Sequence, residues 1–227
     1  MSVEAYFHSR AEQFDALYGP QPRWQRWWNQ TFRAGLYERA AFTLAELRSL
    51  KNFSVLDVGC GSGRNSLLFA EAGARRVVGI DIASNMIDLA NQAATESLCG
   101  QKLTFVKSDF FTAAFDEKFD ACIALGFFDY IRDPVPALRR MAELANQKVI
   151  ASFPGVSLLR APMRKLRYAL RGCPVYFYSS NQIEKFFKEA GVPDCKIIPY
   201  ASSGWLAVAE VAGRAELASP KLVKDTA

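Results

Sequence analysis

The chain has 227 residues, of which 50% are hydrophobic, and it carries a formal net charge of +5. A single domain of this size buries about 70% of its unfolded surface, so it needs neither disulfides nor a structural metal. The charge is too small to identify an anionic partner by itself. The cysteines form no CxxC pair, which disfavours a zinc site and a disulfide framework: Cys60, Cys99, Cys122, Cys173 and Cys195.

Targeting signals are not apparent in the sequence. The first ten residues include Glu4 and lack an apolar run, so we expect no signal peptide. No segment approaches the roughly 18 consecutive apolar residues of a membrane-spanning helix. We therefore expect a cytoplasmic protein.

From residue 53 onward, short apolar runs alternate with helix-like segments. This alternation predicts an α/β fold around a mainly parallel sheet. The predicted strands cover residues 53–58, 76–81, 103–107, 119–125, 148–153, 196–200 and 205–211. The predicted helices cover residues 64–72, 84–97, 133–145 and 179–190.

Three segments lie outside this alternation. Residues 1–50 are rich in aromatic side chains and predict a helical N-terminal cap. Residues 154–178 form a basic insert between the fifth strand and the last helix, inside a main domain predicted for residues 51–212. Residues 213–227 are polar and lack periodicity, so we predict a flexible tail.

A glycine-rich turn runs from Asp57 to Gly63, between the first strand and the following helix. Glycine lets the backbone turn sharply and approach a ligand, and the helix directs its free N–H groups to the same place. A turn at the carboxyl end of a strand also lies where open α/β sheets bind ligands. We therefore expect a ligand site here.

The details of this turn favour one ligand class. Its spacing is GxGxG, whereas a dinucleotide site has GxGxxG. Asp57 would attract the ammonium group of an amino acid and repel a pyrophosphate. Asp81 ends the second strand, at the distance where an acid binds ribose hydroxyls. An amino acid joined to a ribose without phosphate describes S-adenosylmethionine.

Three strings carry a family resemblance: LDVGCGSGRNSLLFAEAGA, VVGIDIASNMIDLA and FVKSDF. Over roughly residues 50–211 the sequence resembles the class I S-adenosylmethionine-dependent methyltransferases. The resemblance implies a Rossmann-like fold, with a doubly wound, seven-stranded, mainly parallel sheet whose last strand is antiparallel. It implies methionine contacts from the turn, ribose contacts from Asp81, adenine contacts from the residues after the second and third strands, and a floor beside the sulfonium after the fourth. The implied cofactor-binding residues are Asp57, Gly59, Cys60, Gly61, Gly63, Asp81, Ile82, Met86, Asp109, Phe110 and Leu125.

Several of these assignments have a structural alternative. A core position is the structural alternative for Ile82, Met86 and Phe110, and an ordinary turn is the alternative for Asp109. In the N-terminal cap, Tyr6 and Arg10 are four residues apart, so they share one side of a predicted helix and would close over the cofactor's carboxylate.

The string after the fourth strand, Leu125 to Tyr130, concerns the reaction. It lacks the Asn/Asp-Pro-Pro-Tyr pattern of enzymes that methylate nucleic-acid bases. No convergent set of acids indicates a metal site, although Asp129 and Asp133 stay open as ligands. The string resembles small-molecule members that methylate quinone precursors or the carboxylate of magnesium protoporphyrin. This implies in-line O-methylation of a small acidic or amphipathic acceptor.

Candidate catalytic residues follow from that chemistry. An ionised acceptor needs little or no base, whereas a neutral hydroxyl needs one. Asp129 and Tyr130 follow the fourth strand, and His8 is the chain's single histidine. His8 is a base if the N-terminal cap covers the cofactor, and otherwise a surface residue.

The basic insert leaves the partner open. No acidic residue lies between Glu143 and Glu184, and residues 158–171 interleave cations with apolar side chains. This pattern is typical of a basic amphipathic helix, which lies on an anionic membrane, covers an anionic or lipid-like acceptor, or packs on the core. Peripheral attachment to the inner membrane surface is therefore one hypothesis. Nucleic-acid binding by the aromatic and basic cap is disfavoured, because tryptophans at 24, 27 and 28 have the spacing of a buried helix face.

Three alternative functions compete with this one. They are an RNA or protein methyltransferase, a non-catalytic S-adenosylmethionine-binding subunit, and a nicotinamide oxidoreductase. Asp57 and the GxGxG spacing weigh most against the last.

Overall fold

The computed structural model describes residues 23–156, 175–200 and 204–211, and only the backbone over residues 23–34. The strands are β1 (Ser54–Val58), β2 (Arg76–Asp81), β3 (Leu103–Lys107), β4 (Phe119–Ala124), β5 (Ala145–Pro154), β6 (Cys195–Tyr200) and β7 (Gly204–Glu210). The helices are α3 (Arg23–Leu47), α4 (Arg64–Glu71), α5 (Ser84–Thr95), α6 (Val135–Leu144) and α8 (Ser180–Glu189), with a 3-10 turn η1 (Gly100–Lys102).

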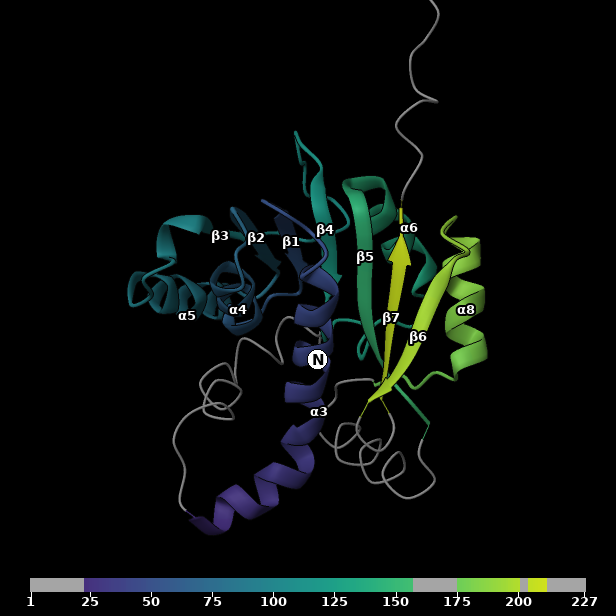
Figure 1. Cartoon of the computed structure of the whole chain (residues 1–227), viewed down its shortest axis with the longest axis horizontal. Helices are drawn as coiled ribbons and strands as arrows, with labels where there is room; N and C mark the ends of the chain where they lie inside the picture. The colour runs from purple at the N-terminus through teal and green to yellow at the C-terminus, as the bar shows by residue number, and fades with distance from the viewer. Residues whose placement is uncertain (1–22, 157–174, 201–203, 212–227) are drawn as a thin grey trace, which may run out of the picture.

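The strands form one seven-stranded sheet in the order β3-β2-β1-β4-β5-β7-β6. All pairs from β3 to β5 are parallel, and β7 runs antiparallel to both β5 and β6 (Figure 1). This arrangement confirms the predicted doubly wound fold. The chain moves outward from β1 to β3 and then returns to β4 on the other side of β1. Such a reversal opens a crevice at the carboxyl ends of the central strands.

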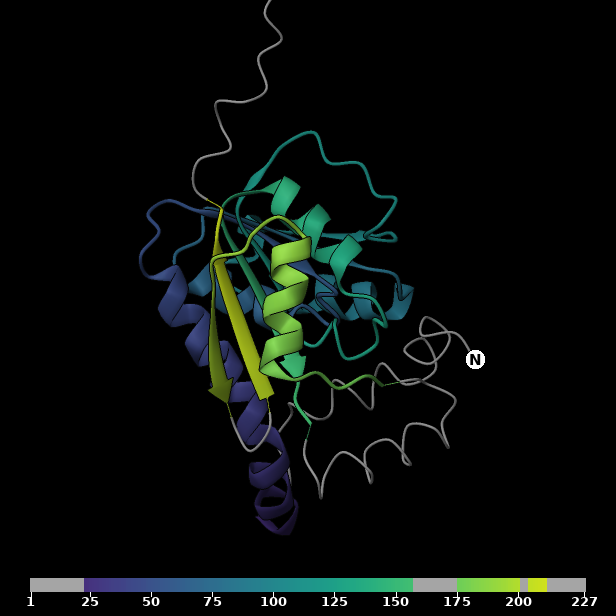
Figure 2. The same ribbon diagram turned by 90° about the vertical axis from the view of Figure 1, so that its right-hand side faces the viewer.

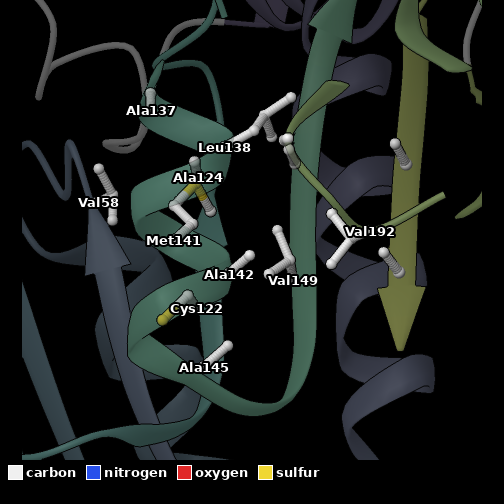
Figure 3. Close-up of a cluster of buried hydrophobic side chains, with 14 of the residues drawn as sticks. Val58, Cys122, Ala124, Ala137, Leu138, Met141, Ala142, Ala145, Val149 and Val192 are labelled. Carbon is white, nitrogen blue, oxygen red and sulfur yellow. The ribbon is translucent and has the colours of Figure 1, made fainter. Parts of the chain in front are cut away.

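Helices cover both faces of the sheet (Figure 2). One buried cluster joins α6 and α8 to side chains of β1, β4, β5 and β7. The cluster includes Met141 and Leu138 of α6, Cys122 of β4 and Val149 of β5, all fully buried (Figure 3). A second cluster joins Leu47 of α3 and Phe69 of α4 to the opposite face.

The C-terminal half of α3 is attached to the sheet by charge as well as by apolar packing. Lys148 of β5 is 5% exposed and pairs with Glu210 of β7. Its Nζ also lies 3.8 Å from Glu46 of α3, which accepts a 3.0 Å hydrogen bond from Lys196 of β6. A buried cation is costly unless it is paired, so these contacts fix the place where α3 crosses the sheet.

Most element boundaries differ from the predicted ones by one to three residues, and two of these differences have a clear cause. β5 begins at Ala145 because this residue leaves the helical conformation immediately after α6, is 2% exposed and pairs with Phe119. α5 ends at Thr95, and the Ser97 hydroxyl then accepts a hydrogen bond from Cys99 N at 3.1 Å. Among the described residues, no helix has the length and apolar character needed to cross a bilayer.

Candidate functional site

The glycine-rich turn connects β1 to α4 at the carboxyl edge of the sheet. Backbone N–H groups of Gly59 and Cys60 both donate to Ile80 O, at 2.9 and 3.1 Å. Gly63 N then donates to Cys60 O at 3.1 Å and leads into α4. The turn thus follows the carboxyl end of β1, as predicted, and it is also bonded to the end of β2.

Asp81, the last residue of β2, joins two backbone segments of the site. One carboxylate oxygen accepts a hydrogen bond from Gly61 N at 2.9 Å, and the other accepts one from Ala83 N at 2.9 Å. Burial raises the pKa of Asp81, while these backbone hydrogen bonds oppose the rise. Ile82 N is a third backbone donor to this carboxylate, which has about four acceptor sites, so the fixed carboxylate keeps the capacity to accept a hydrogen bond from a hydroxyl group.

The three turn glycines have positive φ, but their surroundings differ. A Cβ atom at Gly61 would have no heavy atom within 4 Å. At Gly59 it would lie 2.9 Å from the Phe127 ring, and at Gly63 it would lie 2.7 Å from the Phe105 ring. The backbone of Gly61 therefore faces open space, whereas the absence of a Cβ atom at Gly59 and Gly63 allows aromatic rings to pack closely against them.

Asp57 lies inside the turn and is 1% exposed. Its carboxylate accepts a 2.6 Å hydrogen bond from the Ser66 hydroxyl in the first turns of α4. Burial raises its pKa from 3.8 to about 7, the Ser66 hydrogen bond opposes this rise, Asp81 adds to it, and Arg39 lowers it. Asp57 thus supports the helix start directly and acts on the open side of the turn mainly through its charge.

Arg39 of α3 is a candidate site residue that the sequence reading missed. Both terminal nitrogens of its guanidinium lie 3.1 Å from where a Cβ atom of Gly126 would be, at the end of β4. Arg39 also contributes to the pKa of Asp57 and hydrogen-bonds Tyr200. A cation from α3 therefore lies at the carboxyl ends of β1 and β4, on the side of the sheet that α3 covers.

A sequence signal for Arg39 exists in the pattern of α3. Ala40, Thr43 and Leu47 are buried and repeat at helical spacing. Arg39 is adjacent to this stripe, and its backbone carbonyl accepts a hydrogen bond from the Thr43 hydroxyl at 2.7 Å. A cation beside the buried stripe of a covering helix indicates a partner at the sheet edge.

The predicted adenine contacts are placed around the ends of β2 and β3. Ile82 is 38% exposed, while Met86 and Phe110 are 3% and 4% exposed. The Phe110 ring packs edge-on to Phe127, which favours a core position. Asp109 accepts a hydrogen bond from Phe111 N at 2.9 Å, as a turn residue does. The roles of all four residues in binding adenine stay predictions.

The remaining candidates are divided between the sheet edge and the cap. Cys60 and Leu125 are buried at the ends of β1 and β4, and Asp129 is 8% exposed. Tyr130 is half-buried, and its N–H donates to Phe127 O at 3.2 Å. Their roles stay predictions too. The assignments of Tyr6, His8 and Arg10 lie outside the described residues, as does the amphipathic pattern of residues 158–171.

The raised pKa of Asp57 predicts how the substitution Asp57→Asn affects stability. An acid whose pKa is raised in the folded state stabilises the protein below pH 3.8 and loses this contribution as pH rises through about 7. Asp57→Asn removes the titration but keeps an acceptor for Ser66. We therefore expect the free energy of unfolding of the variant, relative to that of wild type, to increase by on the order of 2–4 kcal/mol as the pH rises from about 4 to about 8. Urea unfolding without ligand measures this difference.

Asp120→Asn is the matched control for that measurement. Burial tends to raise the pKa of Asp120, but hydrogen bonds from Ser54, Gln147 and Arg75 outweigh it and lower the pKa. The contribution of the Asp120 carboxylate to stability is therefore lost only at acidic pH. The difference in the free energy of unfolding between Asp120→Asn and wild type should thus stay constant from pH 5 to 8. A flat difference for Asp57→Asn over this range would contradict the burial argument.

Comparisons with known proteins agree with this geometry. Residues 55–148 match the family described as methyltransferase domain. The ubiquinone biosynthesis O-methyltransferase of Actinobacillus pleuropneumoniae serotype 7 is 32% identical over 146 residues, 60% of this chain and 60% of that protein. The magnesium-protoporphyrin O-methyltransferase of Synechocystis is 34% identical over 121 residues, 52% of this chain and 51% of that protein. The chain thus matches between half and two thirds of the length of these relatives.

A solved structure extends the likeness to most of the chain. Magnesium protoporphyrin IX methyltransferase from Synechocystis PCC 6803, crystallised with bound SAH, superposes with a TM-score of 0.75 and 25% identity. The superposition covers 92% of this chain and 97% of that one. The predicted resemblance is confirmed: residues 55–148 match the methyltransferase domain family, and the chain has the fold of the S-adenosylmethionine-dependent methyltransferases.

Proposed function

We propose that this protein uses S-adenosylmethionine to methylate an oxygen atom of a small acidic or amphipathic acceptor. The observation that carries the proposal is the open space beside Gly61, bordered by the fixed carboxylate of Asp81 and by the charge of Asp57. The relatives named as O-methyltransferases and the solved structure with bound SAH support the same reaction.

The residues present fit the proposed methyl donor group by group. Asp81 would accept a hydrogen bond from the ribose hydroxyls, because its carboxylate keeps acceptor capacity beyond its backbone hydrogen bonds. The Arg39 guanidinium would bind the carboxylate, as a planar cation suited to a bidentate contact. Asp57 would favour the ammonium and sulfonium charges, since it lies buried behind the turn. A pyrophosphate would be repelled by both carboxylates.

When bound, S-adenosylmethionine supplies an electrophilic methyl group on a sulfonium. The protein's part is then to align the acceptor oxygen behind that methyl group and to exclude water. An acceptor that is already ionised needs no base. For a neutral hydroxyl we propose Asp129 and Tyr130, which follow β4, or His8 as the group that takes the proton.

Donor binding tests the cofactor assignment. Isothermal calorimetry should show that S-adenosylhomocysteine binds and NAD does not. Asp81→Asn should weaken S-adenosylhomocysteine about 10- to 100-fold, because one oxygen that serves both the backbone and the ribose becomes an amide donor. Asp116→Asn, at an exposed acid, is the control and should bind as wild type does. Binding of NAD alone would overturn the proposal.

A labelled-methyl assay tests the acceptor class. Protein incubated with donor and host lipid, quinone-precursor and porphyrin extracts should place label in a small-molecule fraction. Brief alkali then separates the products, because a methyl ester releases the label and an aryl methyl ether keeps it. Label confined to RNA or protein would replace this proposal with the alternative of a macromolecular methyltransferase. Donor binding without transfer to any fraction would favour a non-catalytic binding subunit.

Location is a separate part of the proposal. We propose that the protein is cytoplasmic and contacts an anionic membrane surface through residues 158–171, as their charge and apolar pattern indicate. Flotation with anionic and with neutral liposomes tests this contact. The proposed membrane contact is wrong if the protein floats with neither kind of liposome.

A further inference from the structure

Tyr200 connects three elements at the edge of the candidate site. It is the last residue of β6 and hydrogen-bonds both Ser152 of β5 and Arg39 of α3. Ser152 is fully buried, and its hydroxyl accepts a hydrogen bond from Gly126 N at 2.8 Å. Since the Arg39 guanidinium lies over Gly126, the contacts form a closed loop from α3 through β6 and β5 to the end of β4.

Two glycines leave the space that this closed loop of contacts requires. Gly204 of β7 pairs with Tyr200, and a Cβ atom at Gly204 would lie 2.3 Å from the tyrosine ring. A Cβ atom at Gly126 would lie 3.1 Å from both terminal nitrogens of Arg39. Even an alanine at Gly204 would displace the ring, and at Gly126 it would press on the cation. The backbone therefore accommodates this placement of the phenol and the guanidinium.

A second contact helps to fix the Arg39 guanidinium, because its charge also interacts with Asp57. The buried carboxylate of Asp57 attracts the guanidinium. An arginine side chain also has many rotamers, and fixing it in one geometry costs conformational entropy. The Tyr200 hydroxyl accepts a hydrogen bond from Arg39 and so limits the orientations open to the guanidinium beside Gly126.

We propose that Tyr200, with Ser152, is a positioning residue that holds Arg39 in place to bind the carboxylate of the methyl donor. This inference rests on the proposed function, since it takes S-adenosylmethionine as the ligand. Tyr200 acts through Arg39 and needs no contact with the donor.

The test compares two ligands that share a nucleoside. S-adenosylhomocysteine carries the amino-acid carboxylate, whereas 5′-deoxy-5′-methylthioadenosine lacks it. Tyr200→Phe removes only the hydroxyl, so we expect about 5- to 20-fold weaker binding of S-adenosylhomocysteine and a change of less than about twofold for methylthioadenosine. In the labelled-methyl assay, the KM for the donor should rise by a similar factor while kcat at saturating donor changes little.

Arg39→Gln tests whether Tyr200 acts through the cation. It should weaken S-adenosylhomocysteine more than Tyr200→Phe does, and the double variant should bind no more weakly than Arg39→Gln alone. Additive losses in the double variant would overturn the proposed route through Arg39. An equal loss of both ligands in Tyr200→Phe would show a merely structural role.

Tyr178→Phe is the matched control for losing a buried phenol hydroxyl. Tyr178 is 5% exposed and donates to Ile131 O, outside the loop of contacts around Arg39. This variant should lose stability but keep the affinity for both ligands. If wild type binds S-adenosylhomocysteine well and Tyr200→Phe binds it equally well, the inference fails while the proposed function stands. If wild type does not bind S-adenosylhomocysteine, the proposed function itself fails.

Discussion

Two buried carboxylates at the ends of neighbouring strands constrain the site more than any other feature. Asp57 is on β1 and Asp81 ends β2, and the two strands are parallel and directly paired. Burial raises the pKa of both acids, and the charge of Asp81 raises that of Asp57 further. Such a pair is costly to ionise unless hydrogen bonds or cations compensate for it. The surrounding structure supplies both kinds of compensation.

Hydrogen bonds compensate the acids from within the fold. Ser66 of α4 donates to Asp57, while Gly61 and Ala83 donate to Asp81. The same contacts fix the turn and the starts of α4 and α5, so the local fold and the local charge depend on each other. Arg39 adds a cation from α3, and a ligand with its own positive charge would complete the compensation. The physical requirement of the fold and the chemistry of a sulfonium donor thus coincide.

The part of this site that sequence reasoning predicted is the part formed by consecutive residues. The strands at 76–81 and 103–107 were predicted with their observed bounds, because short runs of β-forming residues end there at turns or at a terminal acid. The turn from Asp57 to Gly63 is likewise continuous in the chain. Its glycines proved less uniform than the pattern indicates, since the Phe127 and Phe105 rings that approach Gly59 and Gly63 come from distant strands or loops.

Contacts between distant segments could not be predicted in the same way. Arg39, Ser152 and Tyr200 come from a covering helix and two strands, more than a hundred residues apart from first to last. Only the return of β5 and β6 to the same edge brings them together. Short-range periodicity reports which face of an element is buried, but not which partner it meets there.

The proposed acceptor side of the site, around Asp129 and Tyr130, also depends on contacts between distant segments. Tyr176 N donates to Asp129 O at 2.9 Å, and Gly155 forms a parallel bridge with Tyr178. The residues on either side of segment 157–174 therefore lie together, next to the loop that carries Asp129 and Tyr130. The proposed donor contacts come from strand ends that the sheet fixes, whereas the proposed acceptor-side residues Asp129 and Tyr130 lie in a loop whose position depends on its contact with Tyr176.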